Sequence, residues 1–179
     1  MPNSKDPLKR AKSLNVTGVT RKTVINHIFD YESDEEVHTK QFLEALDAMR
    51  KSELLGKQIK YKLGYSNFTF ELWMVLHKID CNGPLTHRSQ YLNPINRAYR
   101  ESFASLDHYK QETNFHRILG KLALAEVKDA INRSKNIMQR NGQNGYTLHE
   151  YRRYKYYKEN PSLSIWESIE KILDDCRLL

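Results

Sequence analysis

The chain has 179 residues, a length that suits one domain or one domain with a small appendage. Lysine and arginine total 29 against 22 aspartate and glutamate residues, so the formal net charge is +7 and the protein attracts polyanions such as nucleic acids. The two cysteines form no CxxC pair, and no stretch reaches the roughly 18 apolar residues of a membrane span. We therefore expect a cytoplasmic protein without disulfides, a signal peptide or a membrane segment.

The N-terminal half contains three segments with helical patterning. Thr20 suits the N-cap of a short helix over residues 20–29, and an acidic run with capping-box spacing opens a helix over residues 33–55. Residues 67–79 are apolar all round, which predicts the central buried helix of the domain. Their Phe-Thr-Phe run also suits a strand pair, so a sheet at this position is the alternative.

The C-terminal half predicts four further helices between turn and cap signals. These helices cover residues 94–111, 114–140, 148–159 and 165–176. The glycine- and asparagine-rich stretch at residues 141–145 separates the second from the third and predicts a flexible joint. The sequence as a whole therefore indicates a mostly α protein with six to eight helices.

The segment from Gly18 to Ile28 reads Gly-Val-Thr-Arg-Lys-Thr-Val-Ile-Asn-His-Ile. It resembles the turn and recognition helix of helix-turn-helix DNA-binding proteins. Gly18 permits the tight turn, and Val24 and Ile28 would pack inward. The outer face would then contact DNA, with Thr20 at the helix start holding a phosphate and the other polar residues reading bases. The predicted DNA-binding residues of this segment are Thr20, Arg21, Lys22, Thr23 and Asn26.

A second segment, residues 59–73, also resembles the turn of many helix-turn-helix activators through its Leu-Gly-Tyr-Ser run. Lys60, however, occupies a position where a small residue is normally buried. The residues that follow are too apolar to be buried and also present a polar reading face. We interpret this segment as part of the core rather than as the reading unit.

Basic and aromatic side chains are interleaved in residues 151–158, Tyr-Arg-Arg-Tyr-Lys-Tyr-Tyr-Lys. Basic groups attract phosphates, and tyrosines offer stacking and hydrogen-bonding groups, so this combination suits nucleic-acid binding. The alternative is a tyrosine stripe that packs on the core while the basic face is solvated. The residues predicted to hold phosphates are Arg152, Arg153, Lys155 and Lys158.

Known catalytic motifs are absent from the sequence, which contains no glycine-rich phosphate loop, no Gly-x-Ser-x-Gly and no His-x3-His spacing. Glu112 and His116 would share one helix face, but pairs of this kind are common by chance. We therefore expect a non-enzymatic protein with no catalytic residues, no cofactor and no metal.

Three parts are expected along the chain: a basic arm with the helix-turn-helix over residues 1–30, a helical core over 31–140 and a helical hairpin over 146–179. The leading hypothesis is a DNA-binding protein that regulates transcription or replication, of a mobile element for example, as a homodimer on double-stranded DNA. The alternatives are a non-enzymatic helical assembly factor that meets an acidic partner, and an RNA-binding module.

Overall fold

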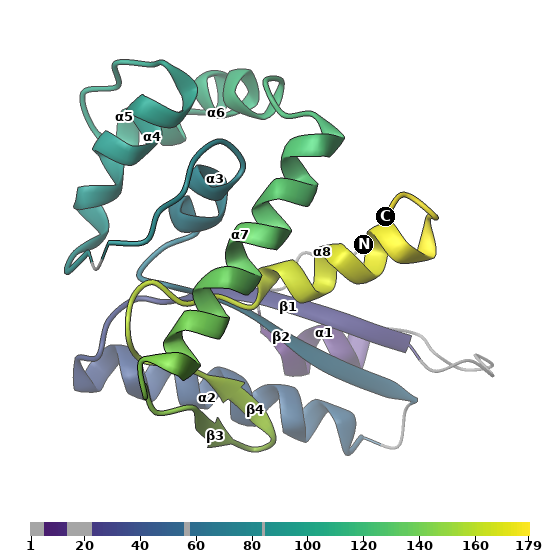
Figure 1. Cartoon of the computed structure of the whole chain (residues 1–179). Helices are drawn as coiled ribbons and strands as arrows, with labels where there is room; N and C mark the ends of the chain where they lie inside the picture. The colour runs from purple at the N-terminus through teal and green to yellow at the C-terminus, as the bar shows by residue number, and fades with distance from the viewer. Residues whose placement is uncertain (1–5, 14–22, 56–57, 84) are drawn as a thin grey trace.

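The computed structural model is an α/β protein (Figure 1). It describes residues 6–13, 23–55, 58–83 and 85–179. Its larger sheet has two parallel strands, β1 (Thr23–Tyr31) and β2 (Ile59–Asn67), joined by the crossover helix α2 (Glu36–Glu53). Parallel neighbours require such a crossover, because a tight turn cannot connect them. The expectation of a mostly α fold is therefore wrong.

The predicted recognition helix is strand β1 from Thr23 onward, while residues 20–22 lie outside the described part of the chain. Val24 and Ile28, expected to pack inward, are 47% and 43% exposed. The odd-numbered residues from 25 to 31 face the core instead, which is the two-residue period of a strand. β-Branched side chains favour this conformation, and pairing with β2 overrides the local cap signal.

The sheet lies between α2 on one face and α8 (Ile165–Asp175) on the other (Figure 1). An aromatic cluster fills the α2 side, where the Phe42 ring lies 4.9 Å from the rings of both Tyr31 and Tyr156. The residues packed with them include Leu46, Met49, Tyr61, Tyr65 and Tyr154. These contacts explain why the central β2 residues are buried despite the small size of the sheet.

A second core holds the upper helices of Figure 1 together. The elements are α3 (Glu71–Leu76), a 3-10 turn (Arg88–Tyr91), α4 (Leu92–Tyr99), α5 (Leu106–Lys110), α6 (Glu112–Leu119) and α7 (Leu124–Gln143). Every residue of α3 is buried, which confirms a central helix, although it is shorter than residues 67–79 because β2 extends to Asn67. The helices expected over 94–111 and 114–140 are each divided in two; Arg100, in the left-handed conformation, ends the first piece.

The segment expected to be a helix over residues 148–159 is an antiparallel hairpin of β3 (His149–Tyr151) and β4 (Tyr154–Tyr156). Arg152 and Arg153 form its two-residue turn with φ of 52° and 80°. Positive φ at both positions is typical of a type I′ hairpin turn, which usually contains Asn and Gly, so the sequence lacks the usual hairpin signal. The expected helical hairpin over 146–179 is therefore wrong, whereas its last helix is confirmed as α8.

The remaining helix, α1 (Pro7–Ser13), contacts α2 beneath the sheet, and the Tyr61 hydroxyl donates a hydrogen bond to the Pro7 carbonyl at 2.9 Å. Helix α7 extends to Gln143, into the stretch expected to be a flexible joint, where the Asn141 side chain donates to the Pro161 carbonyl. No helix in the described ranges combines the length and the apolar character needed to cross a bilayer.

Candidate functional site at the carboxyl ends of the parallel strands

The carboxyl ends of β1 and β2 lie at one edge of the sheet, the edge where open α/β sheets bind ligands. β1 places Asp30 there, in register with Ser66 of β2. β2 ends at Asn67, and Phe68 follows with a φ of 60°. Aromatic residues rarely adopt positive φ, and backbone strain of this kind concentrates at functional sites. Glu71 is the first residue of α3, which follows β2. One carboxylate at the end of β1 and another just after β2 therefore lie at the same edge of the sheet.

Asp30 has a strongly perturbed carboxyl group. Burial raises its pKa from 3.8 to about 7; the negative charges of Glu71 and Glu32 add to this effect, and Lys110 and Arg88 oppose it. Four of these interacting residues lie at the strand ends, and we call them the carboxyl-end site: Asp30, Glu71, Arg88 and Lys110. A carboxyl with a pKa near neutrality can both hold and release a proton at physiological pH.

Glu71 is held in place inside the site. Its carboxylate is only 3% exposed, and it accepts a short hydrogen bond from the Thr69 hydroxyl. The Lys110 ammonium lies 3.2 Å from its other oxygen. A charge this deeply buried requires such partners. Lys110 comes from α5, so three separate parts of the chain meet here.

Two open hollows flank the site, and His87 and Arg88 line both of them. One, of about 340 Å³, also has Glu32 and Phe68 on its wall. The other, of about 370 Å³, reaches Lys110. The Ser89 amide donates to His87 Nδ1 at 3.2 Å, which orients this ring at the shared rim. The hollows therefore open to solvent beside Arg88 and Lys110, the two cations of the site, whereas Asp30 and Glu71 are on the wall of neither.

The residues predicted from the N-terminal motif are only partly described. Thr20, Arg21 and Lys22 lie outside the described residues, and Thr23 begins β1. Asn26 lies in the middle of β1, where its side-chain oxygen accepts a hydrogen bond from the Ser168 hydroxyl of α8 at 2.7 Å. This contact gives Asn26 a role in joining α8 to the sheet.

The hairpin residues divide into two groups. Arg152 Nε lies 2.6 Å from the Asp47 carboxylate, which lowers the pKa of that carboxyl, and Lys158 is exposed after β4. Arg153 and Lys155 instead line a hollow of about 330 Å³ beside β2, together with Lys60 and Lys62. The structure thus brings two of the four predicted phosphate ligands together, and it adds two lysines that sequence reasoning did not select.

The sequence interpretation also missed the carboxyl-end site. The signal that could have found it is the position of Asp30 at the end of an alternating, β-branched segment. Once residues 23–31 are recognised as a buried parallel strand, the acid that ends it becomes a candidate ligand-binding residue. Lys110 and Arg88 carry no comparable signal, because only the fold brings α5 and the 3-10 turn to this edge.

In the part of the chain that the structure describes, no three His, Cys, Asp or Glu side chains are grouped as a metal site.

A family model described as RloB-like protein matches residues 4–172. Neither a curated protein nor a solved structure matches the chain. Because this family model spans nearly the whole chain and residues 23–31 form a strand, the helix-turn-helix resemblance is wrong. The DNA-binding regulator that it suggested stays a prediction.

Proposed function

This chain belongs to the RloB-like protein family, and we propose that it binds nucleic acid and hydrolyses a phosphoester at the carboxyl-end site. The observation that carries the proposal is the Asp30 carboxyl, with a pKa of about 7, at the carboxyl ends of two parallel strands. The expectation of a non-enzymatic protein rested on missing motifs alone, and it stays an untested prediction.

Asp30 is suited to act as the general base. In its ionised form it accepts a proton from a water molecule, whose oxygen then attacks phosphorus. The ester P–O bond breaks, and the leaving oxygen takes a proton from solvent. A base with a pKa near the working pH combines a useful ionised fraction with a strong drive to accept the proton. Glu71 supports this role, because its negative charge helps to raise the pKa of Asp30.

The cations of the site suit a phosphate anion. Arg88 is exposed on the rim of both hollows, and its guanidinium can form two parallel hydrogen bonds to phosphate oxygens. The Lys110 side chain is half-exposed while its ammonium pairs with Glu71. Positive groups fixed beside the reacting phosphorus stabilise the charge that develops there. The net charge of +7 favours a polyanionic substrate over a neutral one.

The experiment compares the wild type with Asp30→Asn on end-labelled single-stranded DNA, duplex DNA and RNA. Each substrate is incubated with Mg²⁺ or with EDTA, because carboxylates are also Mg²⁺ ligands. We expect cleavage of at least one substrate by the wild type and a loss of about 100-fold or more in Asp30→Asn, the size of a general-base contribution. Asp174→Asn, whose side chain is 67% exposed on α8 and lines neither hollow, is the matched control and should retain wild-type activity.

Absence of turnover on all three substrates, or equal activity of wild type and Asp30→Asn, would overturn the proposal. The homodimeric DNA-binding protein predicted from the sequence would give the first of these results together with saturable binding of double-stranded DNA. The helical assembly factor would give neither turnover nor salt-sensitive binding of nucleic acid.

A further inference from the structure

The outer edge of β2 is closed by side chains at residues 61–65 and by a short backbone bridge with residues 162–164 further along, rather than by a third full strand. Tyr61, Leu63 and Tyr65 turn their backbone groups away from β1. The Ser164 hydroxyl donates to the Leu63 carbonyl at 3.1 Å and accepts from the Tyr65 amide at 3.2 Å. Arg153 donates to the Tyr61 carbonyl at 3.1 Å. A hollow of about 330 Å³ opens beside these partners, with Leu63, Arg153 and Ser164 on its wall.

Four cations surround that hollow, which we call the β2-edge groove: Lys60 and Lys62 from β2, and Arg153 and Lys155 from the hairpin. Glu167 of α8 is the acidic residue on its wall. Strand β2 and the hairpin are far apart in the sequence, with 92 positions from Lys62 to Tyr154. The fold, rather than one continuous basic segment, therefore brings these charges together. Like charges brought together in this way repel one another unless an anion lies between them.

The cations of the groove are only partly neutralised by the protein. Arg153 forms a short ion pair with Glu53, and the Lys155 ammonium lies 3.9 Å from Glu150. Among the described residues, no ion pair within 4 Å involves Lys60 or Lys62, although the charge of Lys62 acts on Glu167 and opposes the rise that burial gives the pKa of that carboxyl. Both lysines are half-buried along their stems on the strand, which holds their charged ends near the groove.

We propose that the β2-edge groove binds the phosphate backbone of a nucleic-acid strand, whatever its base sequence. Ammonium, guanidinium and backbone amide donors are the groups that hold phosphates. The neighbouring rings of Tyr61 and Tyr154 are buried and cannot stack on bases, so the groove reads no sequence. This surface goes beyond the proposed chemistry, because that chemistry does not require it.

The groove and the carboxyl-end site are separate surfaces along β2. Leu63 and Asn67 are four residues apart on the strand, a distance of about 13 Å at roughly 3.3 Å per residue. Between them the outer edge of β2 forms backbone hydrogen bonds with residues 162–164, so the groove would hold a phosphate backbone independently of the strand ends.

The test measures fluorescence polarisation of a labelled, mixed-sequence single strand and the matching duplex over a series of salt concentrations. The protein carries Asp30→Asn throughout, so that hydrolysis does not consume the probe. Lys60→Gln/Lys62→Gln should weaken binding of every sequence alike and reduce the slope of log affinity against log salt by about 2, one per lost phosphate contact. The single changes should each reduce it by about 1.

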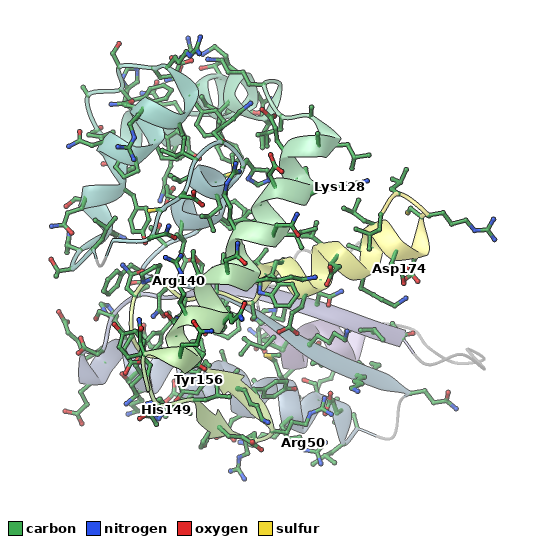
Figure 2. All side chains as sticks on the ribbon, in the orientation of Figure 1. Arg50, Lys128, Arg140, His149, Tyr156 and Asp174 are labelled. Atoms are coloured by element: carbon green, nitrogen blue, oxygen red, sulfur yellow. The ribbon has the colours of Figure 1, made fainter. Side chains whose placement is uncertain are left out.

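Lys128→Gln is the control, since Figure 2 shows Lys128 toward the far end of α7 from the hairpin residues His149 and Tyr156. It removes one positive charge and should leave the salt slope unchanged. Thermal unfolding confirms that each variant is folded. An unchanged slope in the double variant, or an equal loss in Lys128→Gln, would overturn the inference.

A small aryl phosphodiester, too short to reach the groove, separates this inference from the proposed function. In this assay the protein keeps Asp30. The rate of hydrolysis of the ester should be the same for the wild type and for Lys60→Gln/Lys62→Gln. If groove-dependent binding occurs but no phosphoester is hydrolysed, the inference stands and the proposed function fails. If the ester is hydrolysed but the groove variants bind like wild type, the reverse holds.

Discussion

Replacing Asp30 with asparagine should stabilise the folded protein at alkaline pH while it removes the proposed base. The folded state holds this proton up to a pKa of about 7, whereas the ordinary value is 3.8. Between these values the folded state binds more protons than the unfolded state, so wild-type stability falls as pH rises from about 4 to about 7 and levels off above. The difference between these two pKa values corresponds to about 4 kcal/mol in the free energy of unfolding, at roughly 1.4 kcal/mol per pH unit. Solvent screening at this half-buried group brings the expected gain to about 2–3 kcal/mol.

Urea unfolding of wild type, Asp30→Asn and Asp34→Asn at about pH 5 and about pH 8 measures this effect. The free energy of unfolding of Asp30→Asn should exceed that of the wild type by more at the higher pH, because asparagine stays neutral where aspartate ionises. Asp34→Asn, in the exposed loop after β1, should follow the wild type at both values. A difference between Asp30→Asn and wild type that does not change with pH would refute the reasoning.

Three further predictions concern the fold and the assembly. Arg153→Ala should lower the free energy of unfolding by about 1–3 kcal/mol in urea titrations, since Glu53, whose side chain is 6% exposed, loses an ion-pair partner. Arg152→Ala removes only the more exposed pair with Asp47 and should cost less than about 1 kcal/mol. Tyr65→Phe should cost about 1–3 kcal/mol by the same assay, because it leaves the buried Tyr157 amide without its acceptor. The homodimer expected from the sequence predicts twice the chain mass in light scattering, and a monomer mass at micromolar concentration would contradict it.

Two helices could be predicted from the sequence by their apolar faces. The helix expected over residues 33–55 corresponds to α2, and the last helix corresponds to α8. The expected capping box at Ser33 does not form, because Glu35 is the N-cap residue of α2 and makes no side-chain cap hydrogen bond. Their signals are contained within one helix, where residues three and four apart meet on one face. The same local rules placed a central helix near α3, but they gave it too many residues because they could not see where β2 ends.

The strands could not be found in this way, because their evidence is not local. Val24, Ile25 and Ile28 suit a helix face as well as a strand, and the partner of β1 begins 36 residues away at Ile59. The Arg152–Arg153 turn hides the β3–β4 hairpin, since its positive φ angles are stabilised by Asp47 and Glu53 from α2 rather than by glycine. Both candidate sites depend on these strands, so they too could be recognised only in the fold.

The dependence of the hydrolysis rate on pH tests the central claim most directly. With Asp30 as the general base, kcat/KM of the wild type on a nucleic-acid substrate should rise through an inflection near pH 7, the pKa of its carboxyl, and level off above. Asp30→Asn should be slower by about 100-fold or more and should lack this inflection. An inflection that persists in Asp30→Asn, or a wild type that hydrolyses no nucleic acid at any pH, would contradict the account.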